Sequence, residues 1–146
     1  MTEIFTMTDK HREEVLSMMR VFYASPAVAT NGSEEIFRAD VEACVSENPY
    51  LSGYVFMVSG VLAGYGMIAK SFSTEYGVPC IWIEDIYLKP EYRNLGIGSQ
   101  FFSFLEEQFP DHLFRLEVEA ENAPAVHTYR KNGFTEMPYI EMKKGR

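Results

Sequence analysis

The segment from Ile81 to Gln100 constrains the fold more than any other part of the chain. It predicts a long strand over residues 79–88, a turn that contains Gly96 and Gly98, and a helix that begins at about Ile97. Several backbone N–H groups and the positive end of the helix dipole converge at such a junction. Glycine leaves room there for a ligand and permits positive φ angles. We therefore expect the turn to bind an anion.

Two common phosphate-binding motifs do not fit this turn. The chain contains no Gly-x-x-x-x-Gly-Lys-Ser/Thr sequence, and the dinucleotide pattern requires a third glycine where Phe101 stands. Two glycines spaced by one residue also occur in helix-entry turns for structural reasons alone. The pair is therefore weak evidence until its surroundings are considered.

The remaining elements follow from hydrophobic periodicity. Strands are expected over residues 3–7, 53–59, 61–71, 79–88 and 113–118, with one or two closing strands within residues 134–143. Helices are expected after Thr8, from Ser33 to about Ser46, from about Ile97 to Glu107, and from Ala123 to Asn132. In the first helix, one face is expected to enter the core: Val15, Met18, Met19, Phe22 and Tyr23. This order predicts a mixed sheet with helices on its faces.

Length and charge limit the class of protein. The chain has 146 residues, which fit one domain over residues 1–146. Its net charge of -8 and pI near 4.9 argue against a nucleic-acid partner, because phosphate binding needs a basic face. Residues 48–69 carry no charge but are interrupted by glycines, so they are interpreted as a buried hairpin and not as a membrane span. Cys44 and Cys80 are expected to be reduced, buried thiols in a cytoplasmic protein.

The residues Arg93-Asn-Leu-Gly96-Ile-Gly98 match the Arg/Gln-x-x-Gly-x-Gly/Ala signature of the GNAT superfamily of acyl-CoA-dependent N-acyltransferases. As in that family, the signature follows a long strand and opens a helix, and a later helix begins near Asn122 and carries Tyr129. The motifs span roughly residues 80–134. Within the family, the segment looks most like the spermidine/spermine and related small-amine acetyltransferases. The resemblance implies an α/β fold whose mixed, mostly antiparallel sheet has roughly six or seven strands, with about four helices on its faces.

The resemblance also implies acetyl-CoA as co-substrate. Backbone groups of residues 86–88 would pair with its pantetheine arm, residues 94–99 would hold the pyrophosphate, and the start of the last helix would contact the other side. The residues assigned to the cofactor are Ile86, Tyr87, Leu88, Arg93, Asn94, Leu95, Gly96, Ile97, Gly98, Ser99, Asn122 and Ala125. Positive charge would come from Arg93 with Lys89, Arg130 and Lys131, each of which is equally compatible with solvated surface charge.

Glu84 is the candidate general base. Alternation along the strand places it on one face with Trp82, Ile86 and Leu88, and apolar neighbours would raise the pKa of its carboxyl group. An amine must lose a proton before it can attack a thioester, so a carboxylate tuned in this way would accept the proton directly or through water. The alternatives are a structural carboxylate and the neighbouring Asp85, which alternation assigns to the opposite face unless a bulge exchanges them.

Tyr129 is the candidate general acid. The resemblance implies that its phenol protonates the departing CoA thiolate, and packing in the core is the structural alternative. His127 is expected to be exposed, and no His or Cys pair has metal-ligand spacing, so no metal is expected. Cys80 lacks an identifiable base and is a poor nucleophile.

The resemblance therefore implies direct acetyl transfer from acetyl-CoA to a primary amine, with the Leu88 N–H stabilising the thioester oxyanion. A CoA-binding sensor without turnover and a purely structural interaction domain are the alternatives. The acceptor is expected to be a small molecule or a peptide. In this superfamily the first two helices and the loop between them usually shape the acceptor site, here residues 22–31, and their sequence does not identify the acceptor. Glu119, Glu121 and the acidic surface favour a cationic acceptor, although such charges also serve solubility. No membrane partner is expected, and a homodimer is one expected assembly.

Overall fold

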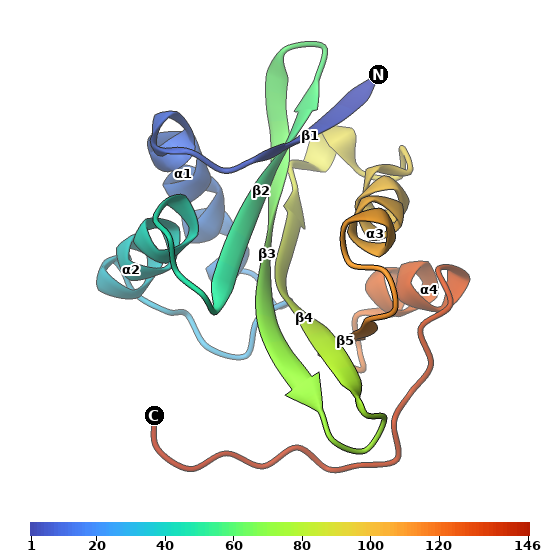
Figure 1. Cartoon of the computed structure of the whole chain (residues 1–146). Coiled ribbons are helices and arrows are strands. Elements are labelled where there is room, and N and C mark those ends of the chain that lie inside the picture. Colours follow the sequence, from blue (N-terminus) through green and yellow to red (C-terminus); the bar gives the residue numbers. More distant parts are fainter.

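The computed structural model describes all 146 residues as one five-stranded sheet with helices on both faces (Figure 1). The strands are β1 (Thr2–Thr6), β2 (Leu51–Val58), β3 (Val61–Ser73), β4 (Val78–Leu88) and β5 (Leu113–Leu116). The helices are α1 (Arg12–Tyr23), α2 (Glu34–Val45), α3 (Ile97–Gln108) and α4 (Ala123–Lys131), with short 3₁₀ turns at Asp9–His11 and Pro90–Tyr92. None of the helices has the length and apolar character needed to cross a membrane.

The strands lie in the order β1-β2-β3-β4-β5. The first four pair antiparallel, and β5 runs parallel to β4. The mixed, mostly antiparallel sheet is therefore confirmed, as is the hairpin expected in the uncharged stretch, which forms β2 and β3. The positive φ of Gly60 closes that hairpin turn.

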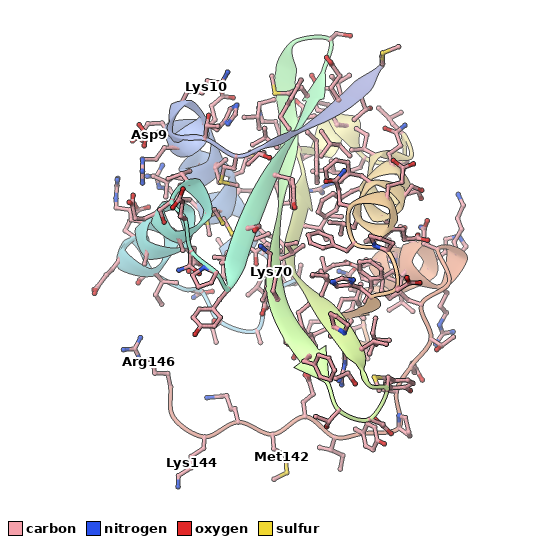
Figure 2. All side chains as sticks on the ribbon, viewed as in Figure 1. Asp9, Lys10, Lys70, Met142, Lys144 and Arg146 are labelled. Carbon is pink, nitrogen blue, oxygen red and sulfur yellow. The ribbon has the colours of Figure 1, made fainter.

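The predicted count of six or seven strands is wrong, because residues 134–143 form no strand. Pro138 lacks a backbone N–H and fixes its φ angle, so a regular ladder cannot continue through it. The segment instead extends past the hairpin between β3 and β4, where the Tyr139 hydroxyl donates to Glu75 at 2.6 Å. Beyond that contact, Met142 and Lys144 project away from the sheet (Figure 2).

Each face of the sheet has its own hydrophobic core. On one face, α1 and α2 bury residues such as Leu16, Met19 and Val41 against β3. On the other face, α3 buries Phe101 and Leu105 against β2, β3 and β4. The predicted inward face of the first helix is confirmed, since Val15, Met18 and Met19 are buried and Phe22 and Tyr23 pack against that core. Cys44 and Cys80 are free and buried, as expected.

Two irregularities of β4 coincide near its middle. Met67 of β3 pairs with Asp85, and the next residue, Ile68, pairs with Ile83, so Glu84 is the extra residue of a bulge. The pairing of β4 with β5 also ends at Ile83. Residues 84–88 therefore have β3 on one side and no strand on the other, which leaves an open backbone edge.

Candidate active site

The bulge places both acidic residues of β4 on the same face of the sheet. The predicted alternation is wrong here: Ile86 and Leu88 pack on the α3 side, whereas Asp85 joins Glu84 on the α1 and α2 side. One inserted residue shifts the period by one position, so every side chain beyond it changes face relative to a regular strand.

A cavity of about 270 Å³ lies on this face, under α1 and α2. It is lined by Tyr23, Asp40, Leu51, Met67, Glu84 and Asp85. These residues come from α1, α2, β2, β3 and β4, so the cavity requires the whole of this half of the fold. Three carboxyl groups share one small volume, which suits a positively charged ligand.

Asp85 is the most enclosed of the three carboxyl groups, with an exposed fraction of 5%. The hydroxyls of Tyr23 and Tyr65 each donate to it at 2.8 Å, one to each carboxylate oxygen. Burial raises the pKa of Asp85 above its ordinary value, and the two hydrogen bonds reduce that shift.

Glu84 and Asp40 lie beside Asp85 without hydrogen-bond donors of their own. Burial raises the pKa of Glu84, and the charges of Asp85 and Glu141 raise it further. Burial, followed by the charges of Asp85 and Glu84, raises the pKa of Asp40 to about 6. Asp40 was not among the residues predicted for the site, although an acidic residue at an inward position of α2, between Phe37 and Cys44, is a detectable signal.

More acidic groups approach the cavity from the C-terminal side. A hydrogen bond between the Glu117 and Glu141 carboxyl groups, followed by burial, raises the pKa of Glu117 to about 7. Glu84 contributes a further electrostatic shift to Glu117. Glu119 and Glu121, which were expected to favour a cationic acceptor, are exposed and do not line the cavity.

The glycine turn has the geometry of an anion site. Asn94 and Gly96 have φ angles of 62° and 81°, and Gly96 precedes α3 without any side-chain cap. The first N–H groups of α3 therefore have no intrahelical partner. A Cβ at Gly98 would meet only Ile86 Cδ1 at 3.9 Å. The protein's own packing does not require glycine at position 98, and the free space fits close approach of a pyrophosphate.

Arg93 braces this turn against β4. Its Nε donates to the Leu88 carbonyl at 2.9 Å, and its guanidinium carbon lies 5.5 Å from the centre of the Tyr87 ring. Two of the other predicted cations pair with carboxylates, Lys89 with Glu14 at 3.9 Å and Arg130 with Glu136 at 3.1 Å. Arg93 thus contacts the end of β4, whereas Lys89 and Arg130 form ion pairs at the protein surface.

Tyr129 packs against the core on the α3 side of the sheet, whereas Glu84 lines the cavity on the α1 and α2 side. Its ring packs edge-on against Phe102 and Phe134, and burial raises the pKa of its phenol. None of the hydrogen bonds in the structure uses its hydroxyl, so the proton is available to a ligand.

The two helices beside the glycine turn are joined directly. Asn132 Nδ2 donates to Ser99 Oγ at 3.0 Å, which links the end of α4 to the first turn of α3. Asn122 caps α4 by accepting from the Ala125 N–H. These hydrogen bonds hold the start of α3 and the end of α4 next to each other, so the predicted cofactor residues of the two helices belong to neighbouring elements.

The remaining sequence candidates have limited chemistry. His127 is exposed, as expected. No group of three or more His, Cys, Asp or Glu residues has metal-site geometry. Burial raises the pKa of Cys80, which reduces the thiolate fraction that a nucleophile needs.

Comparison with known proteins assigns a family to this geometry. Residues 15–134 match the family described as Acetyltransferase (GNAT) family. The thialysine N-epsilon-acetyltransferase of Sus scrofa is 35% identical over 120 residues, which cover 75% of this chain and 68% of that protein. The enzyme of the same name from Caenorhabditis elegans is 28% identical over 97% of this chain and 85% of its own.

Solved structures show the same fold at low sequence identity. A possible acetyltransferase from Clostridium difficile 630 has a TM-score of 0.83 at 19% identity and covers 99% of this chain and 97% of its own. The aminoglycoside enzyme AAC(6')-Iy in complex with a CoA bisubstrate analogue has a TM-score of 0.79 at 16% identity and covers 100% of this chain and 99% of its own.

Proposed function

Since the chain belongs to the GNAT acetyltransferase family, we propose that it transfers the acetyl group of acetyl-CoA directly to the primary amine of a small cationic molecule. The observation that carries this proposal is the cavity lined by Asp40, Glu84 and Asp85, which adjoins the open edge of β4. Three carboxyl groups in one cavity stabilise an ammonium group and disfavour an anion or an apolar ligand.

The relatives narrow the class of acceptor. The Sus scrofa relative is named for thialysine, and the fold neighbour AAC(6')-Iy is named as an aminoglycoside N-acetyltransferase. Thialysine and aminoglycosides are cationic amines, in agreement with the acidic cavity. A polyamine such as spermidine satisfies the same electrostatic requirement, so the acceptor is assigned here by charge and size.

The proposed reaction assigns one proton transfer to each side of the β4 edge. Glu84 accepts a proton from the acceptor ammonium, directly or through water, and the free amine attacks the thioester carbonyl carbon. A C–N bond forms as the C–S bond breaks, and the Tyr129 hydroxyl donates its proton to the leaving sulfur. The nitrogen loses its second proton to the Tyr129 phenolate through water, which restores the phenol, and Glu84 releases the first proton to solvent. The Leu88 N–H would stabilise the carbonyl oxygen. The products are the N-acetylated amine and the CoA thiol.

The acetyl-CoA site is proposed on the residues of the glycine turn. The uncapped start of α3 would bind the pyrophosphate, and the free backbone edge of residues 86–88 would bind the pantetheine arm. The open space at Gly98 supports this assignment, since a side chain there would fill it.

The test is release of free CoA thiol from acetyl-CoA by the purified protein. The acceptor panel contains thialysine, lysine, spermidine and an aminoglycoside, with an arylamine, which is uncharged at neutral pH, as the uncharged comparison. Turnover with one or more cationic amines and little with the neutral compound is expected. Acetyl-CoA binding without turnover of any amine would instead support a CoA-binding sensor.

We also propose that the chain forms a homodimer. β5 has only four residues and ends the sheet with an unpaired outer edge. The extended segment 134–146 leaves Ile140 and Met142 with exposed fractions of 89% and 92%. In a homodimer, the second copy would pair a strand with the open edge of β5 and cover the exposed side chains of Ile140 and Met142 with apolar surface.

A further inference from the structure

The cavity on the α1 and α2 face contains more acidic groups than can be ionised together at low cost. Asp40, Glu84 and Asp85 all line it, and its volume is about 270 Å³. Because the three carboxyl groups line one small, partly buried cavity, the negative charge on each of them disfavours ionisation of the other two. The hydrogen-bond donors around each carboxyl group therefore decide which of the three holds the negative charge.

Those donors all converge on Asp85. The Tyr23 hydroxyl donates to one of its oxygens and the Tyr65 hydroxyl to the other, each at 2.8 Å. With both oxygens accepting, the group has the hydrogen-bond pattern of a carboxylate. No protein donor contacts the carboxyl group of Glu84 or Asp40. Burial and the charge of Asp85 raise the pKa of both phenols, so both tyrosines keep the proton that they donate.

The two tyrosines come from different elements and are held by packing. Tyr23 is the last residue of α1 and lies 5.1 Å, between ring centres, from Phe37 of α2. Tyr65 is fully buried in β3. The titratable groups that face Asp85 are these two phenols, Asp40 and the Cys44 thiol of α2, and Glu84 of its own strand. Glu117 and Glu141 face Glu84 from the C-terminal side.

On the basis of the proposed function, we propose that Tyr23 and Tyr65 are positioning residues that keep Asp85 as a permanent carboxylate, so that Asp85 anchors the acceptor's ammonium group and Glu84 alone exchanges the proton. The two acidic residues of the β4 bulge then have different tasks. One phenol comes from the end of α1, so the placement of that helix and the charge state of the site are linked.

The kinetic test uses Tyr23→Phe and Tyr65→Phe, which keep the rings and remove one hydrogen bond each. Loss of a donor raises the pKa of Asp85, so less negative charge acts on Glu84 and the pKa of Glu84 falls. The acidic limb of the kcat/KM profile is expected to move to lower pH by about half a unit. The KM for the cationic acceptor is expected to rise about tenfold on that acidic limb, because Asp85 is then partly protonated and binds the ammonium group less well.

Tyr54→Phe is the matched control, because Tyr54 is a buried tyrosine of β2 in the core on the α3 side. It should leave both the KM and the acidic limb unchanged. A limb that moves to higher pH in Tyr23→Phe would make Asp85 the base and overturn the proposal. Variants with wild-type KM and an unmoved limb would overturn it as well.

A second measurement needs no substrate, so it separates this inference from the proposed function. The carboxyl carbons of aspartate are followed by NMR against pH in the unliganded protein, with Asp85→Asn identifying the resonance. Asp85 is expected to titrate below Asp40, whose pKa is about 6. In Tyr23→Phe, which removes a half-buried hydroxyl and keeps the ring, the Asp85 titration should move to higher pH. A wild-type Asp85 that is protonated at neutral pH would overturn the proposal even if no amine were acetylated.

Discussion

At Glu84, replacement by glutamine keeps the size of the side chain and removes only its capacity to accept a proton. If Glu84 is the base, Glu84→Gln should lower kcat about 10²- to 10⁴-fold at neutral pH and recover partly at high pH, where the acceptor loses its proton unaided. Steady-state kinetics between pH 6 and 10 measure this. Wild-type activity should fall as the pH drops through the raised pKa of Glu84. An unchanged pH–rate profile would exclude Glu84 as the base and direct attention to an ordered water.

At Tyr129, replacement by phenylalanine separates the packing of the ring from the chemistry of the hydroxyl. Tyr129→Phe keeps the ring contacts with Phe102 and Phe134 and removes a hydroxyl that makes no hydrogen bond within the protein. Melting temperature should therefore be retained, while kcat falls about 10²-fold and the acceptor KM changes less. Full activity of the variant would assign Tyr129 to the core alone.

Asp40 offers a test through stability. Its pKa rises from 3.8 to about 6 on folding, so between these values the folded protein binds more protons than the unfolded chain. The contribution of Asp40 to the free energy of unfolding is therefore lost as the pH rises through this window. Asp40→Asn should raise the melting temperature at pH 7.5 and have little effect at pH 3.5, measured by calorimetry. An equal change at both pH values would contradict this assignment.

At the scale of elements, Gly64 of β3 and Gly98 of α3 both lie near β4 but differ in whether the surrounding atoms leave room for a side chain. A Cβ at Gly64 of β3 would lie 2.2 Å from the Tyr87 carbonyl oxygen, which the β3–β4 ladder prevents from moving, whereas a Cβ at Gly98 would meet only Ile86 at 3.9 Å. Gly64→Ala should therefore lower the melting temperature markedly. Gly98→Val should fold and lose acetyl-CoA affinity by isothermal titration, because its side chain occupies the proposed pyrophosphate space. Wild-type affinity in folded Gly98→Val would disprove the assignment of this turn.

Helices and strands with a regular hydrophobic period were predictable from the sequence, and a strand whose period is interrupted by a bulge was not. The apolar spacing of α1 and α3 and the glycine turn between β4 and α3 predicted their positions to within a few residues. The bulge at Glu84 has no period, so the sequence assigned Asp85 to the wrong face. Tyr23 and Tyr65 look like ordinary core aromatics in sequence, because only the folded chain brings their hydroxyls to Asp85.

At the scale of the whole molecule, the prediction of closing strands in residues 134–143 is wrong for a different reason. The apolar residues of segment 134–146 are typical of a strand, yet a strand forms only where a partner edge is available. In the single chain, Pro138 interrupts the segment and Tyr139 binds beside the β3–β4 hairpin, away from the edge of β5. Sequence alone predicts the strand-forming tendency of this segment and not the edge with which it pairs.

In the proposed homodimer, segment 134–146 supplies apolar surface to the contact between the two copies. Light scattering should give twice the chain mass of 16.7 kDa for the wild-type protein. Ile140 and Met142 are two residues apart, so in an extended segment they face the same side, and Ile140→Asp with Met142→Asp should release monomers. Both side chains are almost fully exposed in the single chain, so the fold of the monomer should be kept. Lys144→Ala, in the same segment but without loss of apolar surface, is the matched control. A monomeric wild type, or a dimer that withstands both charges, would contradict the proposed assembly.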